Sequence, residues 1–199
     1  YQFFIQGHME LLLNIDIFLL YFFNVTISNP VFDKFFPFIT EADNWMLVYV
    51  IGLSLLIWKG GKRGRITAFA LIITIIATDQ FVSSFLKEAV ERIRPCHTLD
   101  DINILVHCGA GKSFPSAHAA NNFAAAVLIT RFYRKYSWLF YTIATLVAFS
   151  RIYVGVHYPL DAIGGALVGA AIAAIIAFIF SKLFYAGKNN GKIHPDDNI

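Results

Sequence analysis

Three ionisable residues lie close together in the last third of the chain, between two long apolar runs. Arg151, His157 and Asp161 belong to the segment 150–161, where we expect lipid to meet water. A charge at the centre of a membrane helix costs roughly 2.5–3.5 kcal/mol on insertion scales, so such residues usually have a function. His157 and Asp161 share a face if the segment is helical, and a carboxylate beside an imidazole fixes its tautomer and raises its basicity. An ion pair that anchors a helix end explains these residues equally well.

The segment 87–118 carries a second set of candidates. Lys87 and Arg94 lie two helical turns apart, so they point the same way if the helix continues to Pro95. Two cations on one helix face make an anion site, although side chains that reach for lipid head groups are the simpler explanation.

Ser116 and His118 precede the next apolar run. Ser116 is well placed to cap a helix that begins at Ala117, and His118 then lies in its first turn. The free N–H groups at a helix start bind phosphate. Taken alone, capping explains Ser116, and a location at the membrane surface explains His118.

The composition is that of a membrane-embedded chain. Apolar residues make up 57% of the sequence, and the charged residues are few and clustered. We predict an all-α polytopic protein, a bundle of six transmembrane helices. The predicted spans are about Leu11–Ile27, Trp45–Trp58, Ile66–Leu86, Ala119–Phe132, Trp138–Phe149 and Leu160–Phe184. The aromatic connector between the first two predicts a short helix at the membrane surface.

The chain divides into three parts. Residues 1–8 resemble a protease and cloning remnant, with Met9 the expected native start. Residues 9–186 form a single membrane-embedded domain, and residues 187–199 form a polar C-terminal tail.

The basic residues orient the predicted bundle. Ten of the 16 lie in the connectors 59–65 and 131–135 and at the C-terminal end, all on one side of a six-span chain. The positive-inside rule places that side, with both termini, in the cytoplasm. The segments 87–118 and 150–161 then share the outer side and can meet. Three cations, a helix start, two histidines and an aspartate on one side suit the transfer of a phosphoryl group.

These residues resemble the three signature motifs of the type 2 phosphatidic acid phosphatase superfamily. The motifs are Lys87-x6-Arg94-Pro95, Pro115-Ser116-Ala117-His118 and Ser150-Arg151-x5-His157-x3-Asp161. One position departs from the pattern, because the family usually has glycine where this chain has Ala117. The N–H of Ala117 still binds phosphate if the backbone angles there suit a Cβ atom.

The resemblance implies a role for each residue. His157 attacks phosphorus and forms a phosphohistidine, Asp161 holds its tautomer, and His118 protonates the leaving oxygen and then activates water. The groups that bind the phosphate are Lys87, Arg94, Arg151, Ser116 and the N–H of Ala117.

No metal or other cofactor is implied for this chemistry. The implied partners are the bilayer and a lipid phosphate, with no nucleic acid, and the sequence does not indicate an oligomeric state. We expect a multi-pass protein of the bacterial inner membrane whose site faces the periplasm.

Undecaprenyl pyrophosphate, phosphatidylglycerophosphate, phosphatidic acid and lipid A phosphates all fit as substrates. A lipid phosphotransferase or a lipid transporter could use the same phosphate site.

Other residues carry structural expectations. Cys96 and Cys108 are the two cysteines, and a disulfide, free thiols or a metal site with His97 and His107 are all open. Asp79 lies inside an apolar span and is expected to pair with an asparagine at 121 or 122. Glycines at 164, 165 and 169 allow the last helix to pack closely.

Overall fold

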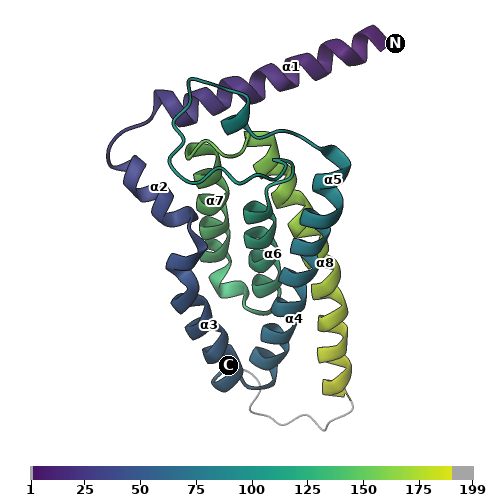
Figure 1. Cartoon of the computed structure of the whole chain (residues 1–199). Coiled ribbons are helices and arrows are strands. Elements are labelled where there is room, and N and C mark those ends of the chain that lie inside the picture. Colours follow the sequence, from purple (N-terminus) through teal and green to yellow (C-terminus); the bar gives the residue numbers. More distant parts are fainter. Residues whose placement is uncertain (1, 190–199) are drawn as a thin grey trace.

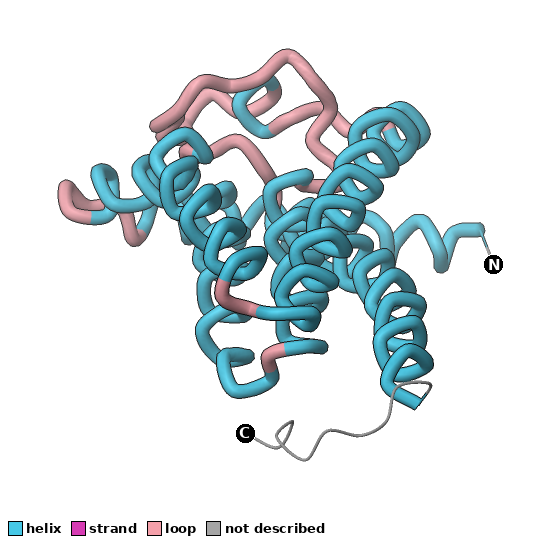
Figure 2. Tube along the Cα trace, turned by 90° about the horizontal axis from the view of Figure 1, so that it is seen from below, coloured by secondary structure: helices cyan, strands magenta, loops and turns pink. Residues whose placement is uncertain are grey.

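The computed structural model describes residues 2–189, which contain helices and loops but no strand (Figure 2). The α-helices are α1 (Gln2–Tyr21), α2 (Phe32–Thr40), α3 (Met46–Trp58), α4 (Gly61–Gln80), α5 (Lys87–Val90), α6 (Ala117–Phe132), α7 (Ser137–Tyr153) and α8 (Pro159–Asn189). Short helical turns of other types lie at Phe22–Thr26, Ala42–Trp45, Phe81–Leu86, Pro95–His97 and Arg134–Tyr136. The predicted all-α class is confirmed for this part of the chain.

Both ends of the described chain are helical. α1 begins at Gln2, so most of the segment 1–8 belongs to this helix. α8 continues to Asn189, past the predicted start of the polar tail at 187. Residues 190–199 of that tail lie outside the described residues.

Helices α4, α6, α7 and α8 run side by side, with α6 at the centre of the bundle (Figure 1). α6 packs against the other three, while α2 packs against α7 and α3 against α4. The buried side of α6 carries small residues, which let neighbouring helices approach closely. They are Ala119, Ala120, Ala124 and Ala126.

The predicted close packing of the last helix is confirmed at two glycines. A Cβ atom on Gly165 would collide with the carbonyl oxygen of Ser116, and one on Gly169 would collide with that of Ala120. Both neighbours are backbone atoms and cannot turn away. The glycines of α8 therefore set how closely it approaches the start of α6, where the second motif lies.

Three helical stretches are long and apolar enough to cross a membrane: Met9–Thr26, Gly61–Val90 and Pro159–Lys182. A fourth candidate is the pair Phe32–Thr40 and Ala42–Trp58, which is bent by 73°. α2 is the short helix predicted in the aromatic connector. α6 and α7 have 16 and 17 residues, below the ~20 of an ordinary span. The described chain thus has three or four candidate spans by length and composition.

Helix α1 does not lie alongside the bundle as a first span was expected to. It crosses the end at which α6 and α8 begin (Figure 1). One stripe of α1 and the turn after it is buried, at Asp16, Leu20 and Asn24. This spacing of four residues is one helix face, and that face anchors α1 across the bundle end.

The expected continuous helix up to Pro95 is wrong. The helical stretch ends at Val90, and Glu91 adopts a left-handed backbone with φ of 52°. Arg94 is extended, with ψ of 150°, because the ring of a following proline disfavours helical geometry. Lys87 and Arg94 are therefore brought to one region by a turn and not by a shared helix face.

Candidate active site

All the predicted site residues lie at one end of the bundle, where α5 and α7 end and α6 and α8 begin (Figure 1). Lys87 begins α5, His118 is in the first turn of α6, and Arg151 is in the last turn of α7. His157 lies in the connection between α7 and α8, and Asp161 is in the first turn of α8. Residues up to 74 positions apart in sequence thus share one end of the fold.

His157 and Asp161 form a buried pair. Nδ1 of His157 lies 3.3 Å from Oδ2 of Asp161, and the two residues are 1% and 0% exposed. The same oxygen accepts the backbone N–H of Tyr158 at 2.8 Å. The helix α8 begins only at Pro159, so a turn and not a common helix face brings the two side chains together.

Arg94 contacts the other side of the same imidazole. Its Nη1 lies 3.2 Å from Nε2 of His157 and donates to the carbonyl oxygen of Val156 at 3.1 Å. Its Nε donates to the carbonyl oxygen of Gly111 at 3.0 Å. Because a guanidinium can only donate, Nε2 must be the acceptor, and the ring proton sits on Nδ1 facing Asp161. The geometry thus selects the tautomer with the lone pair on Nε2, where it accepts from Arg94 in this structure.

Burial also keeps this imidazole uncharged. Loss of solvent lowers the pKa of His157 from 6.5 to about 4, with Arg151 and Arg94 acting in the same direction and Asp161 opposing them. At neutral pH the ring therefore holds one proton and one lone pair. A neutral imidazole of fixed orientation is a competent nucleophile.

Arg151 holds an unsatisfied donor. Its Nη1 donates to Oγ1 of Thr40 at 2.9 Å, but its buried Nε has no hydrogen-bond partner among the described residues. Buried donors are nearly always paired, so this one indicates a place for an acceptor oxygen. The charges of Arg151, Arg94 and Lys87 all act on the His118 imidazole, so the cations and both histidines share one electrostatic environment.

The start of α6 has the predicted cap. Oγ of Ser116 accepts the N–H of Ala119 at 3.5 Å, and the N–H of Ser116 donates to the carbonyl oxygen of Asp161 at 2.9 Å. Ala117 begins the helix, and Glu91 is the non-glycine residue with positive φ in the described chain. Ala117 thus has an ordinary backbone, and its Cβ does not prevent this turn from presenting N–H groups.

Two residues of this region escaped the sequence analysis. Arg92 donates to Asp161 and also to Asp16 of α1. The available signal was Asp16 itself, a carboxylate inside an apolar run, which usually marks a functional residue.

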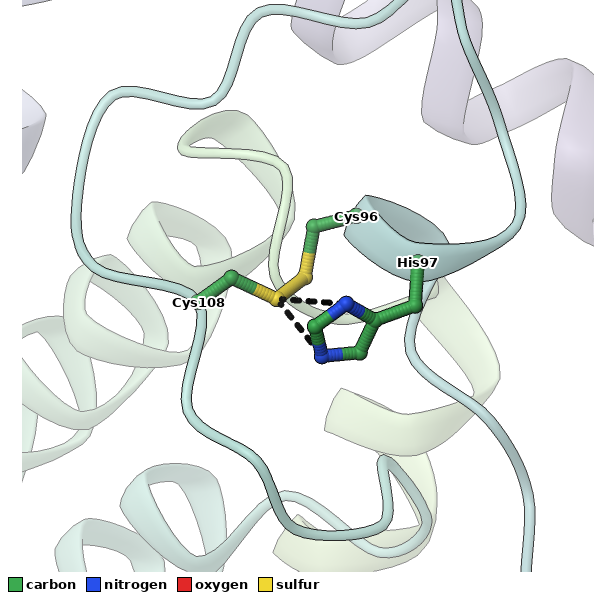
Figure 3. Close-up of side chains that lie close together, drawn as sticks. All are labelled: Cys96, His97 and Cys108. Atoms are coloured by element: carbon green, nitrogen blue, oxygen red, sulfur yellow. Dashed lines mark hydrogen bonds between the residues drawn. A yellow bond between two sulfur atoms is a disulfide. The ribbon is translucent and has the colours of Figure 1, made fainter.

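Cys96 and Cys108 form a disulfide in the loop above the site, with Cα atoms 6.4 Å apart (Figure 3). Nε2 of His97 lies 3.4 Å from Sγ of Cys108. These three residues have the ligand types of a metal site, but metals bind thiolates, and sulfurs bonded to each other offer none.

The predicted pairing of Asp79 inside the bundle is confirmed. Its Oδ1 accepts a hydrogen bond from Nδ2 of Asn121 at 3.2 Å.

Comparison with known proteins identifies the family. The sequence profile of the PAP2 superfamily matches residues 68–185. A protein of Bacteroides thetaiotaomicron named lipid A 4'-phosphatase is 35% identical over 88% of this chain and 81% of its own length. The undecaprenyl-diphosphatase BcrC of Bacillus subtilis is 33% identical over 78% of each chain.

A solved structure agrees with this assignment. The transmembrane PAP2 type phosphatidylglycerolphosphate phosphatase of Bacillus subtilis superposes with a TM-score of 0.61 at 25% identity, over 80% of this chain and 81% of the other. The chain belongs to the PAP2 superfamily, and it is a phosphatase of that class.

Proposed function

We propose that this protein removes phosphate from a membrane lipid phosphate or pyrophosphate through a phosphohistidine on His157. The observation that carries the proposal is the fixed tautomer of this residue. Asp161 faces Nδ1, so Nε2 carries the lone pair that attacks once Arg94, which faces this atom, turns to the phosphate. A nucleophile oriented by a carboxylate, with a cation beside the attacked group, is the arrangement that phosphoryl transfer requires.

The reaction proceeds in two balanced steps. Nε2 of His157 attacks phosphorus in line, the bond from phosphorus to the lipid oxygen breaks, and His118 gives that oxygen a proton. Burial and the neighbouring cations lower the pKa of His118 in the free site to about 3, so this ring takes up its proton when the phosphate dianion binds beside it. Water then attacks the phosphohistidine and passes a proton to His118, which releases phosphate and restores both histidines. Lys87, Arg94 and Arg151 neutralise the phosphoryl oxygens, with Ser116 and the N–H of Ala117 as further donors. Side-chain cations supply this charge, so the proposed reaction uses no metal.

The substrate class follows from the relatives. One is named lipid A 4'-phosphatase, one undecaprenyl-diphosphatase and one phosphatidylglycerolphosphate phosphatase. These names share an amphipathic lipid with a terminal phosphate, and we propose that such an envelope lipid is the substrate. A side-by-side assay of phosphate release from lipid A, undecaprenyl diphosphate, phosphatidylglycerophosphate and phosphatidic acid ranks the candidates.

We further propose six membrane crossings, with both termini in the cytoplasm and the site facing the periplasm. This topology requires α1 to turn from its place across the bundle end to a path alongside the other helices. The basic connectors at 59–65 and 131–135 lie at the bundle end away from the site, which supports this orientation. α1 exposes apolar residues on most of its surface, among them Leu11, Leu12, Ile15 and Phe18. An exposed apolar surface of this extent on one helix suits contact with lipid. A reporter fused to the N-terminus tests the count, since a periplasmic signal would leave five crossings.

The experiment that tests the proposed chemistry compares His157→Ala with His107→Ala, which removes an exposed histidine of the outer loop. Phosphate release should persist in a chelator, vanish in His157→Ala and survive in His107→Ala. Full activity in His157→Ala would refute the mechanism. Transfer of phosphate to a lipid acceptor would indicate a phosphotransferase, and lipid movement without hydrolysis would indicate a transporter.

A further inference from the structure

Arg92 joins two buried carboxylates that come from opposite ends of the sequence. Its Nη1 donates to Oδ1 of Asp161 at 2.8 Å, and its Nη2 donates to Oδ2 of Asp16 at 2.6 Å. The two carboxylate side chains are fully buried, while that of Arg92 is 18% exposed. Two short charge-assisted bonds from one planar guanidinium fix both partners in orientation as well as in distance.

The bond to Arg92 completes the surroundings of Asp161. Oδ2 accepts from the N–H of Tyr158 and faces Nδ1 of His157, so Oδ1 is the oxygen left to be held. Arg92 holds it, and a rotation of the carboxylate would break contacts on both oxygens. The direction in which Oδ2 points at His157 therefore depends on Arg92.

Arg92 is itself held on a second side. Its guanidinium carbon lies 3.9 Å from the centre of the Tyr158 ring, and the hydroxyl of Tyr158 lies 2.9 Å from Oγ1 of Thr98. An arginine stacked on an aromatic face loses less freedom for each hydrogen bond that it makes. This contact ties Arg92 to the residue that follows His157 in the chain.

Asp16 adds a contribution from α1. Its Oδ1 accepts the N–H of Leu160 at 2.8 Å, in the first turn of α8, and the residue is 1% exposed. A carboxylate at this position satisfies a free N–H and interacts favourably with the positive end of the α8 dipole. Asp16 lies outside residues 68–185, which the superfamily profile matches, so the family assignment says nothing of it.

We propose that Arg92 and Asp16 are positioning residues for the phosphoryl-transfer step, acting on His157 through Asp161. The inference rests on the proposed function, because it assigns these residues to the nucleophile of that reaction. Stability alone is a poor explanation for the arrangement. Buried ion pairs lose much of their Coulombic gain to desolvation, and apolar residues of similar volume often serve stability as well.

The test measures kcat and KM for phosphate release from phosphatidic acid in mixed micelles, in Arg92→Gln, Arg92→Lys, Asp16→Asn and the double variant Asp16→Asn/Arg92→Gln. We expect kcat to fall about 10–100-fold in Arg92→Gln, the usual loss when a residue that orients a functional side chain is removed. KM should stay within about twofold, because Arg92 holds a carboxylate and not the phosphate. Arg92→Lys should recover part of the loss. The double variant should resemble Arg92→Gln, because the two residues act in one chain of contacts.

Two matched controls and a folding measurement complete the design. Glu10→Gln changes an exposed carboxylate of α1. Arg63→Gln removes an arginine that also stacks on a tyrosine, 4.8 Å from the Tyr133 ring, near the other end of the bundle. Both should keep wild-type kcat, and the melting temperature of every variant allows kcat to be stated per folded molecule.

Three outcomes would overturn the inference: an unchanged kcat in folded Arg92→Gln, a rise in KM alone, or additive losses in the double variant. His157→Ala is assayed in parallel, so the two proposals fail separately. Activity retained in His157→Ala removes the proposed mechanism. Activity lost there but kept in Arg92→Gln removes only the positioning role.

Discussion

The Nη1 atom of Arg94 lies 3.2 Å from Nε2 of His157, so a permanent cation occupies the side of the imidazole that we propose as nucleophilic. In the free enzyme this contact fixes the tautomer and keeps the ring from gaining a proton. In the substrate complex that we propose, the same guanidinium contacts the oxygens of the attacked phosphoryl group. One residue thus prepares the nucleophile and receives the charge of the group that it attacks.

Arg94→Lys should lower kcat/KM by about 10²–10³, as the loss of one preorganised charged donor does. Lysine keeps the charge but cannot donate at once to His157, Val156 and Gly111 in the fixed geometry of a guanidinium. Steady-state kinetics check this, with Arg63→Lys as the control in the first turn of α4. Equal kinetics in both variants would show that charge alone matters at position 94.

The pH dependence of kcat/KM should show an acidic limb near pH 4. Burial lowers the pKa of His157 to about 4, so the neutral ring persists as the pH falls to that value and is lost below it. A solvent-exposed histidine would place the limb near 6.5. The charged groups that act on this ring are Asp161, Arg151 and Arg94, and His118 interacts with it as well.

The same shift affects stability with a defined sign. Between pH 6.5 and about 4 the unfolded chain binds a proton at His157 that the folded chain does not, so folding free energy is lost as the pH falls through this window. Thermal melts of wild type and His157→Gln across that range check the prediction. A steeper loss of stability in the variant would contradict it.

Gly165→Ala and Gly169→Ala should destabilise the protein by about 1–3 kcal/mol, the usual cost of overpacking. The new methyl groups meet the backbone carbonyls of Ser116 and Ala120, which cannot yield without moving α6. Gly165→Ala should also lower kcat, because it displaces the cap of the second motif. Gly52→Ala in α3 is the matched control, since a Cβ there meets nothing within 4 Å. Its melting temperature should stay the same or rise.

Reduction of the disulfide should lower activity without unfolding the bundle. Cys96 follows Arg94 by two residues, and Cys108 precedes Gly111, the acceptor of Arg94 Nε, so the bridge restrains the loop that holds this arginine. Closing a loop of this size contributes up to about 3 kcal/mol in the chain-entropy model.

The control for this prediction is Cys96→Ser/Cys108→Ser, which contains no thiol to reduce. A thiol reductant should bring wild-type activity down to the level of the double variant and leave that variant unchanged. Loss of activity in both would place the effect of the reductant elsewhere.

Local features of this protein were determined by the sequence alone. The cap at Ser116 predicted that a helix begins at Ala117, as α6 does, because helix starts depend on a few neighbouring residues. The three motifs predicted the family, and the structure brings their residues to one end of the bundle. The pairing of Asp79 with Asn121 could be anticipated because few polar partners exist inside an apolar bundle.

Only the tertiary structure decided how these parts meet. Arg94 reaches His157 through a turn at Glu91, because proline at 95 and a left-handed residue replace the expected helix. The bond from Arg92 to Asp16 joins residues 76 positions apart, and it depends on α1 lying across the bundle end. Sequence periodicity shows which face of a helix is apolar. The partner of a buried charge is decided by the packing of the whole chain, because contacts between distant segments leave no local pattern in the sequence.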